Sequence, residues 1–144
     1  MRRAYLALAW RPGDADAADR ARDIGLRVAA ETGWRAQPAF PGLALWTDPA
    51  QPLPVRPTPG APGVLLGEVF PMPGAEPGLS PLAPGPVRDG SPRDVAARLS
   101  RALWGRYVAL LQAPDGVLAV YRDPSGSLDA MTWDLGDGLF VVAS

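Results

Sequence analysis

The amino-acid sequence predicts an α+β fold in which sheets pack together and helices cover their outer faces. Short apolar runs with the pattern of buried strands recur along the chain. Two longer stretches have the apolar spacing of amphipathic helices, and the order of elements is strand, helix, strands, helix, strands. Because 144 residues suffice for one domain with a sizeable core, we expect residues 1–144 to form a single domain.

The first half of the chain is expected to begin with a central strand, followed by a helix. Residues 3–10 are apolar on both faces, which is typical of a strand covered on both sides. The helix spans 14–32, where Asp14 or Asp16 can cap its first turn and Gly33 follows its end. Its buried stripe is predicted to contain Ala17, Ala21, Ile24 and Val28. Further short strands are predicted over 34–38, 42–48 and 64–70.

A proline tract runs from Pro49 to Pro62. Proline lacks a backbone N–H, so this tract can form neither a helix nor a central strand. We interpret it as an extended surface loop. The alternative is a polyproline-II ligand for SH3 or WW-like modules. A second irregular stretch covers 71–90.

The second half of the chain is expected to contain one helix and four strands. Ser91 caps the helix, with Pro92 at the first helical position and Asp94 at the third. The buried face of this helix is predicted to contain Ala96, Leu99, Ala102 and Leu103. The strands are predicted over 105–113, 117–122, 128–134 and 138–143. Core packing is expected for all five tryptophans, at positions 10, 34, 46, 104 and 133.

Missing residue types exclude several chemistries. The chain contains no Cys, His, Lys or Asn, which excludes a thiolate nucleophile, an imidazole base and a Schiff-base lysine. A formal net charge of −1 provides no basic field for nucleic acid. No apolar run reaches the about 18 residues that predict a membrane span. We therefore expect neither a nucleic-acid partner nor a membrane.

Three short segments near the end of the chain resemble one protein family. A strand reading Gly105-Arg106-Tyr107-Val108-Ala109 precedes a turn at 122–126, and the chain closes on Val141-Val142-Ala143-Ser144. This series resembles the end of the N-terminal glutaminase-like domain of asparagine synthetases, a class II glutamine amidotransferase domain. In that family a G-x-[FY]-[AV] strand leads to an R-D-x-x-G turn, and the last strand ends F-x-x-A-S. The resemblance implies the four-layer α/β/β/α sandwich of the Ntn (N-terminal nucleophile) hydrolases.

The segment 122–126 can be interpreted as a local turn or, from the family resemblance, as part of an interface. Asp-Pro-Ser-Gly is a good type I turn sequence, with proline at the second position and glycine at the fourth. In the family the equivalent turn lies toward the synthetase domain. The resemblance therefore implies a possible synthetase-domain interface at Arg122, Asp123, Pro124, Ser125 and Gly126.

The residues that hydrolyse glutamine in that family are replaced in this chain. The family nucleophile is a Cys that follows the initiator Met, and Arg2 stands there instead. The family strand N-G-E-[IV]-[YF] corresponds to 66–70, where Leu66 replaces the Asn that donates to the oxyanion. Losing one such donor costs about 2.7–4 kcal/mol of barrier. Pro41 and Gly42 occupy the positions of the Arg residues that bind the glutamine carboxylate.

We therefore expect a degenerate glutaminase pocket at Arg2, Leu66, Gly67 and Glu68, with no catalytic residue, metal or cofactor in this chain. Lasso-peptide macrolactam synthetases and β-lactam synthetases resemble asparagine synthetases without the Cys. This chain is rich in Pro and Ala and contains the segments G-R-Y-V-A and R-D-P-S-G, and in these features it is most similar to the lasso-peptide group. Enzymes of these two groups adenylate a carboxylate with ATP, and an amine of the same substrate attacks the adenylated carboxylate. ATP and Mg²⁺ are thus expected only in a synthetase domain that follows Ser144.

The resulting hypothesis is a catalytically inactive domain of a bacterial, cytoplasmic ligase. Its partners would be the synthetase domain, in cis or in trans, and a precursor peptide. Three alternatives remain open at this point. The chain could be a free-standing binding module that acts in trans, an amidohydrolase with an unusual nucleophile, or an unrelated α+β domain.

Overall fold

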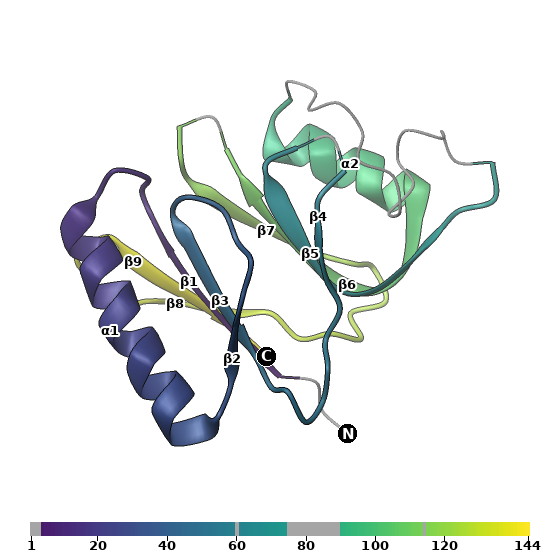
Figure 1. Ribbon diagram of the computed structural model, residues 1–144. Helices are drawn as coiled ribbons and strands as arrows, with labels where there is room; N and C mark the ends of the chain where they lie inside the picture. Colours follow the sequence, from purple (N-terminus) through teal and green to yellow (C-terminus); the bar gives the residue numbers. More distant parts are fainter. Residues whose placement is uncertain (1–3, 60, 75–89, 114) are drawn as a thin grey trace. The chain divides into compact units, whose positions relative to one another are not determined.

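The computed structural model describes residues 4–59, 61–74, 90–113 and 115–144. These residues form two antiparallel sheets and two helices, which confirms the α+β fold class (Figure 1). The chain divides into two compact units, 1–53 with 130–144, and 54–129. Each unit contains one sheet and one helix, and the single-domain expectation stays a prediction.

The first unit is built on a five-stranded sheet in which β1 is the central strand, as predicted. The sheet order is β2-β3-β1-β9-β8. Both neighbours of β1, β3 and β9, run antiparallel to it. Leu8 stands opposite Ala44 on β3 and opposite Val141 on β9. The strands are β1 (Tyr5–Trp10), β2 (Arg35–Gln37), β3 (Leu43–Thr47), β8 (Met131–Asp134) and β9 (Leu139–Ala143).

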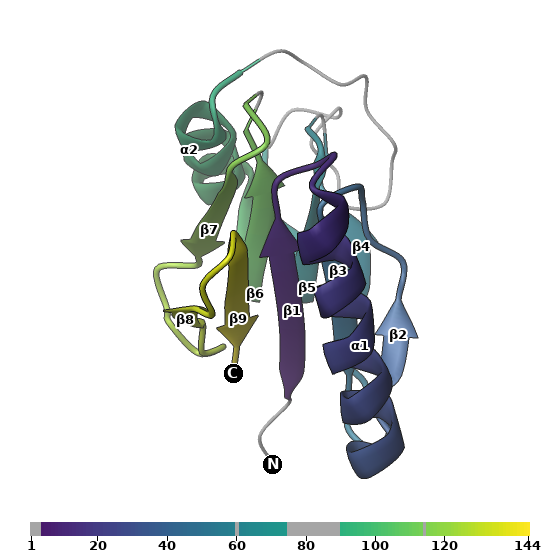
Figure 2. The same cartoon turned by 90° about the vertical axis from the view of Figure 1, so that its left-hand side faces the viewer.

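Helix α1 (Ala15–Thr32) runs along one face of this sheet, beside β1 and β3 (Figure 2). Asp14, and not Asp16, is its N-cap, and its carboxylate accepts a hydrogen bond from the Ala17 backbone N–H at 3.0 Å. Gly33 ends the helix in the left-handed conformation that glycine adopts without strain (φ 71°). The buried helix residues are Ala17, Ala21 and Gly25, whereas the predicted Ile24 and Val28 are only half-buried.

The second unit is built on a four-stranded sheet with the order β4-β5-β6-β7. Strands β5 and β6 pair along their full length, from Gly63 opposite Leu111 to Pro71 opposite Leu103. The interpretation of 49–62 as a surface loop is wrong for part of the tract, because β4 pairs with β5 there and Leu53 is buried. The strand is an edge strand, where proline is tolerated. The strands are β4 (Val55–Pro57), β5 (Gly63–Pro71), β6 (Leu103–Gln112) and β7 (Leu118–Arg122).

Helix α2 (Pro92–Ala102) covers one face of the second sheet. A complete capping box starts it, because the Ser91 hydroxyl accepts from the Asp94 backbone N–H and the Asp94 carboxylate accepts from the Ser91 backbone N–H, each at 3.2 Å. The helix buries Val95, Leu99 and Ala102 in one cluster with side chains of β5 and β6. Leu103 is already extended, so β6 begins two residues before the predicted start.

Core packing was a wrong prediction for two of the five tryptophans. Trp46 is buried, but Trp104 is 53% exposed and Trp133 is 47% exposed. Trp133 lies on β8, an edge strand whose four residues are all exposed and which begins at Met131 and not at 128. In the described part of the chain, neither helix has the length and apolar character needed to cross a bilayer.

Replacing Ser91 by Ala should weaken the start of α2. The variant loses the hydroxyl that accepts from the Asp94 backbone, and we expect the free energy of unfolding to fall by about 1 kcal/mol. Urea denaturation measures this loss. Ser91→Thr keeps a capping hydroxyl and should retain most of the stability.

The same variant should show a pH dependence. The hydrogen bonds from Ser91 lower the pKa of Asp94 below its usual 3.8. Because the folded-state pKa lies below the unfolded one, the stabilisation is complete above about pH 4 and disappears as the pH falls through the folded pKa. The stability difference between wild type and Ser91→Ala should therefore narrow in acid, and an unchanged difference at pH 2 would contradict this origin.

Candidate functional site on strands β5 and β6

The described residues that were predicted to form the degenerate pocket lie on β5, which pairs with the neighbouring strand β6. Leu66, Gly67 and Glu68 are consecutive residues of β5 and stand opposite Val108, Tyr107 and Arg106, respectively. Arg2, the fourth predicted member, lies outside the described residues. Three of the four predicted positions are therefore on one strand.

Leu66 contributes packing at this site and no polar group. Its side chain has no exposed surface, and its neighbours across the strand pairs are Val55 on β4 and Val108 on β6. A fully buried aliphatic side chain can neither donate nor accept a hydrogen bond. The position that the resemblance assigns to an oxyanion donor is thus a core position in this chain.

Gly67 is required by a close backbone contact between β5 and β6. Its φ is +112°, and a Cβ there would lie 2.1 Å from the Arg106 carbonyl oxygen. Gly105 on β6 has the reciprocal geometry, with φ +142° and a Cβ position 2.1 Å from the Glu68 carbonyl oxygen. Side-chain-bearing residues rarely adopt these angles. The resemblance assigns Gly67 to the site, but no sequence pattern indicates that Gly105 has the matching geometry on the opposite strand.

Glu68 and Arg106 form an ion pair across the two strands. The Arg106 Nη2 atom lies 2.8 Å from Glu68 Oε2, and the side chains retain 59% and 33% exposure for Arg106 and Glu68. A pair this exposed contributes about 0–1 kcal/mol. Two residues further along each strand, the rings of Phe70 and Trp104 pack with centroids 4.8 Å apart. The site is therefore an ionic pair beside an exposed aromatic pair.

Tyr107, next to Arg106 on β6, carries an ionisable phenol. Burial and the neighbouring Tyr121 raise the pKa of its phenol well above the ordinary value of 10. The phenol therefore stays neutral at physiological pH and cannot act as a base. In the described ranges, no three His, Cys, Asp or Glu side chains stand together as metal ligands would.

The predicted turn at 122–126 is confirmed as a turn, and its acidic residue is bound tightly to β6. Asp123 is buried, and its Oδ2 accepts from the Tyr107 backbone N–H at 3.1 Å. Its Oδ1 accepts from the Ser125 backbone N–H at 2.8 Å and from the Ser125 hydroxyl. The Gly126 N–H closes the turn on the Asp123 carbonyl at 3.0 Å. The Asp123 carboxylate therefore joins the turn to the strand.

The remaining residues of the turn differ in how much surface they offer. Arg122 bonds back to the Gly126 carbonyl and pairs with Asp129 at 3.5 Å. Pro124 and Ser125 are exposed at the tip. The predicted interface thus has two parts: a tip that is accessible, and flanking residues that hold the tip in shape.

Comparisons of the chain with models of known protein families, with curated proteins and with solved structures found no match.

Gly67→Ala should destabilise the second unit far more than Gly74→Ala. Both glycines have positive φ, but an added Cβ at Gly74 has nothing within 4 Å, whereas the one at Gly67 meets backbone. Backbone strain should lower the free energy of unfolding of both variants by about 1 kcal/mol, and the clash should lower that of Gly67→Ala by roughly a further 1–3 kcal/mol. Urea denaturation of both variants measures the difference. Equal losses would show that no close contact exists between β5 and β6.

Asp123→Asn should lower the free energy of unfolding by about 1–3 kcal/mol, because the amide nitrogen cannot accept the hydrogen bond that one carboxylate oxygen now accepts. Asp115 is the matched control, since only its Oδ1 accepts, from the Val117 backbone N–H at 3.1 Å. Asp115→Asn keeps that oxygen and should change stability by less than about 0.5 kcal/mol. Thermal and urea unfolding of the two variants test this, and a loss at Asp115 as large as that at Asp123 would contradict it.

Proposed function

We propose that this chain is the catalytically inactive, glutaminase-like domain of an asparagine synthetase-like ligase that forms amide bonds with ATP, of the lasso-peptide macrolactam synthetase type. The observation that carries the proposal is the state of β5. The strand that resembles the family's oxyanion strand holds a fully buried leucine where the polar donor would stand. Replacement of a polar oxyanion donor by a buried apolar side chain is expected where glutamine hydrolysis has been lost.

The architecture supports the same proposal. Two antiparallel sheets, each covered by a helix, are compatible with a four-layer α/β/β/α sandwich of the Ntn type.

The chemistry of the proposed ligase explains why the glutaminase site is dispensable. A carboxylate that has been adenylated is attacked by an amine already present in the substrate, so no ammonia from glutamine is needed. In this proposal ATP and Mg²⁺ bind the synthetase domain, in the cytoplasm. The present chain supports that domain, in cis or in trans, and borders the cleft for a precursor peptide.

The turn at 122–126 is the proposed contact with the synthetase domain. Its buried Asp123 holds the exposed tip, Pro124 and Ser125, in one conformation through bonds to Tyr107 and Ser125. A preorganised tip loses little conformational entropy when it meets a partner. This favours a structural role for the turn within a larger assembly.

Two experiments test the proposal. The purified chain is incubated with L-glutamine, and we expect ammonia release no faster than in buffer. The gene is read beyond codon 144, and we expect the S-G-G-x-D-S pyrophosphate-binding signature, either in the same frame or in a neighbouring gene whose product co-purifies with this chain. Glutamine hydrolysis well above buffer would contradict the inactive site. Failure to find any such synthetase would contradict the ligase assignment.

A further inference from the structure

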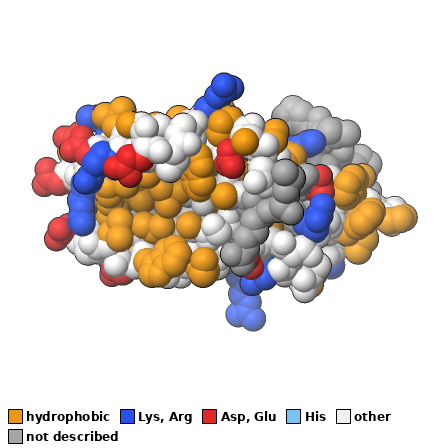
Figure 3. All heavy atoms as spheres, turned by 90° about the horizontal axis from the view of Figure 1, so that it is seen from below, with side chains coloured by type: hydrophobic (Ala, Val, Ile, Leu, Met, Phe, Trp, Pro, Cys, Tyr) orange, Lys and Arg blue, Asp and Glu red, His pale blue; other side chains and the backbone are white. Residues whose placement is uncertain are grey.

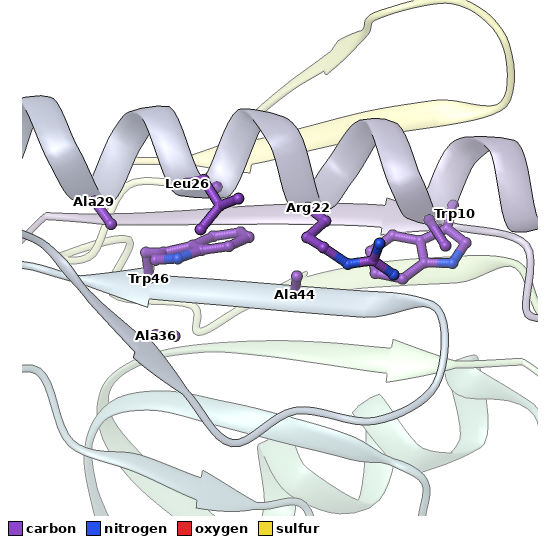
Figure 4. A pocket seen from close by; sticks show the side chains of 9 residues that line it. Trp10, Arg22, Leu26, Ala29, Ala36, Ala44 and Trp46 are labelled. Atoms are coloured by element: carbon purple, nitrogen blue, oxygen red, sulfur yellow. The ribbon is translucent and has the colours of Figure 1, made fainter.

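A hollow of about 430 Å³ lies between α1 and the sheet of the first unit (Figure 4). Four alanines and Gly25 line it together with the indoles of Trp10 and Trp46, and Arg22 is the one charged residue among the described residues of the lining. Figure 4 shows Leu26 and Trp46 at one end, Arg22 reaching from α1 toward Trp10 at the other, and Ala44 between them. This volume falls in the about 300–1,000 Å³ range of small-molecule sites.

The hollow exists because small residues face each other across the helix–sheet contact. Ala29 on α1 and Ala44 on β3 both line it, and neither side chain is long enough to span the gap between the two elements. Leu26, on the same helix face, is 65% exposed and therefore does not fill it. The contact between α1 and the sheet is therefore incompletely filled at this position.

The floor of the hollow is closely packed. A Cβ at Gly25 would lie 2.0 Å from the Trp46 Cζ2 atom, so the indole packs directly against the helix backbone. Trp46 also belongs to the buried cluster with Leu8, Ala21 and Val141. Trp46 is 7% exposed, so only a small part of its indole borders the hollow, and this packing holds that part in place, which lowers the entropic cost of binding.

The Arg22 guanidinium forms a weak, exposed ion pair within the chain. Its Nη1 atom pairs with Asp19 Oδ1 at 2.8 Å on the same helix, and both side chains are more than two-thirds exposed. Such a pair contributes about 0–1 kcal/mol and can be exchanged for a bound anion. On the side of the molecule where α1 lies, Figure 3 shows hydrophobic side chains gathered in one area, with acidic and basic side chains along its edge.

We propose that this hollow binds a small, planar, apolar molecule that carries one anionic group. Its ring system lies over Ala44 between the indoles of Trp10 and Trp46, and its anion meets the Arg22 guanidinium. The two indoles that border the hollow favour an aromatic ring, the alanines leave room for it, and the Arg22 cation selects the sign of its charge. The proposal does not depend on the proposed ligase function.

The test uses the whole chain and the aromatic sulfonate 8-anilinonaphthalene-1-sulfonate as the probe, followed by probe emission and by quenching of tryptophan fluorescence. We expect saturable binding of one molecule per chain. Ala29→Leu fills the hollow and should weaken binding about ten-fold, whereas Ala30→Leu, at the next and exposed position of α1, should leave it unchanged. These variants share the same added side chain on the same helix, so only the direction of that side chain differs.

The anionic part is tested separately. Arg22→Gln should weaken sulfonate binding about five-fold at low salt and remove most of its salt dependence, while Arg27→Gln, at an exposed position of the same helix, should do neither. The uncharged analogue N-phenyl-1-naphthylamine should bind wild type and Arg22→Gln equally well. If Arg22→Gln and Arg27→Gln bind the sulfonate equally, the assigned role of Arg22 is wrong.

Two further results would overturn the site itself. One is the absence of saturable binding to the wild-type chain, and the other is equal binding by Ala29→Leu and Ala30→Leu. Because the probe also binds partly unfolded proteins, the urea midpoint of each variant is measured in parallel. If Ala29→Leu does not fold, Ala18→Leu replaces it, since Ala18 lines the same hollow from the preceding turns of α1.

Discussion

The close backbone contact between β5 and β6 is the constraint on which the second unit depends. Gly67 and Gly105 each leave out a side chain that would lie 2.1 Å from a carbonyl oxygen of the opposite strand. With both side chains absent, the two strands pair along their whole length. Every other element of the unit is attached to this ladder: β4 pairs with β5, β7 pairs with β6, and α2 packs on the face that they share.

The features of the candidate site follow from the same contact. The register that brings Gly67 opposite Tyr107 also brings Glu68 opposite Arg106 and Phe70 opposite Trp104, so an ion pair and an aromatic pair stand side by side. Asp123 then binds the backbone of Tyr107, one residue further along β6. The Asp123 carboxylate therefore positions backbone, as expected of a structural clamp.

A second glycine contact shapes the first unit in a different way. Gly25 lets the Trp46 indole lie against α1, which anchors the helix on the sheet at one point. On either side of that point the facing residues are small, and a hollow remains beside the anchor. Close packing at one position and loose packing next to it thus arise from the same row of small residues, and this combination distinguishes the surface of this unit from a fully packed helix–sheet layer.

The sequence alone determined the elements that local rules control. Caps at Asp14, Ser91 and Gly33 marked the helix ends, and apolar runs marked the strands, because capping groups and side-chain periodicity act over a few residues. Which residue opposes which was decided only by the tertiary structure. The position of Gly67 opposite Tyr107 and of Gly105 opposite Val69, the burial of Asp123 and the exposure of Trp104 and Trp133 depend on strand register and edge position. These are set by contacts between residues far apart in the chain, which no local pattern encodes.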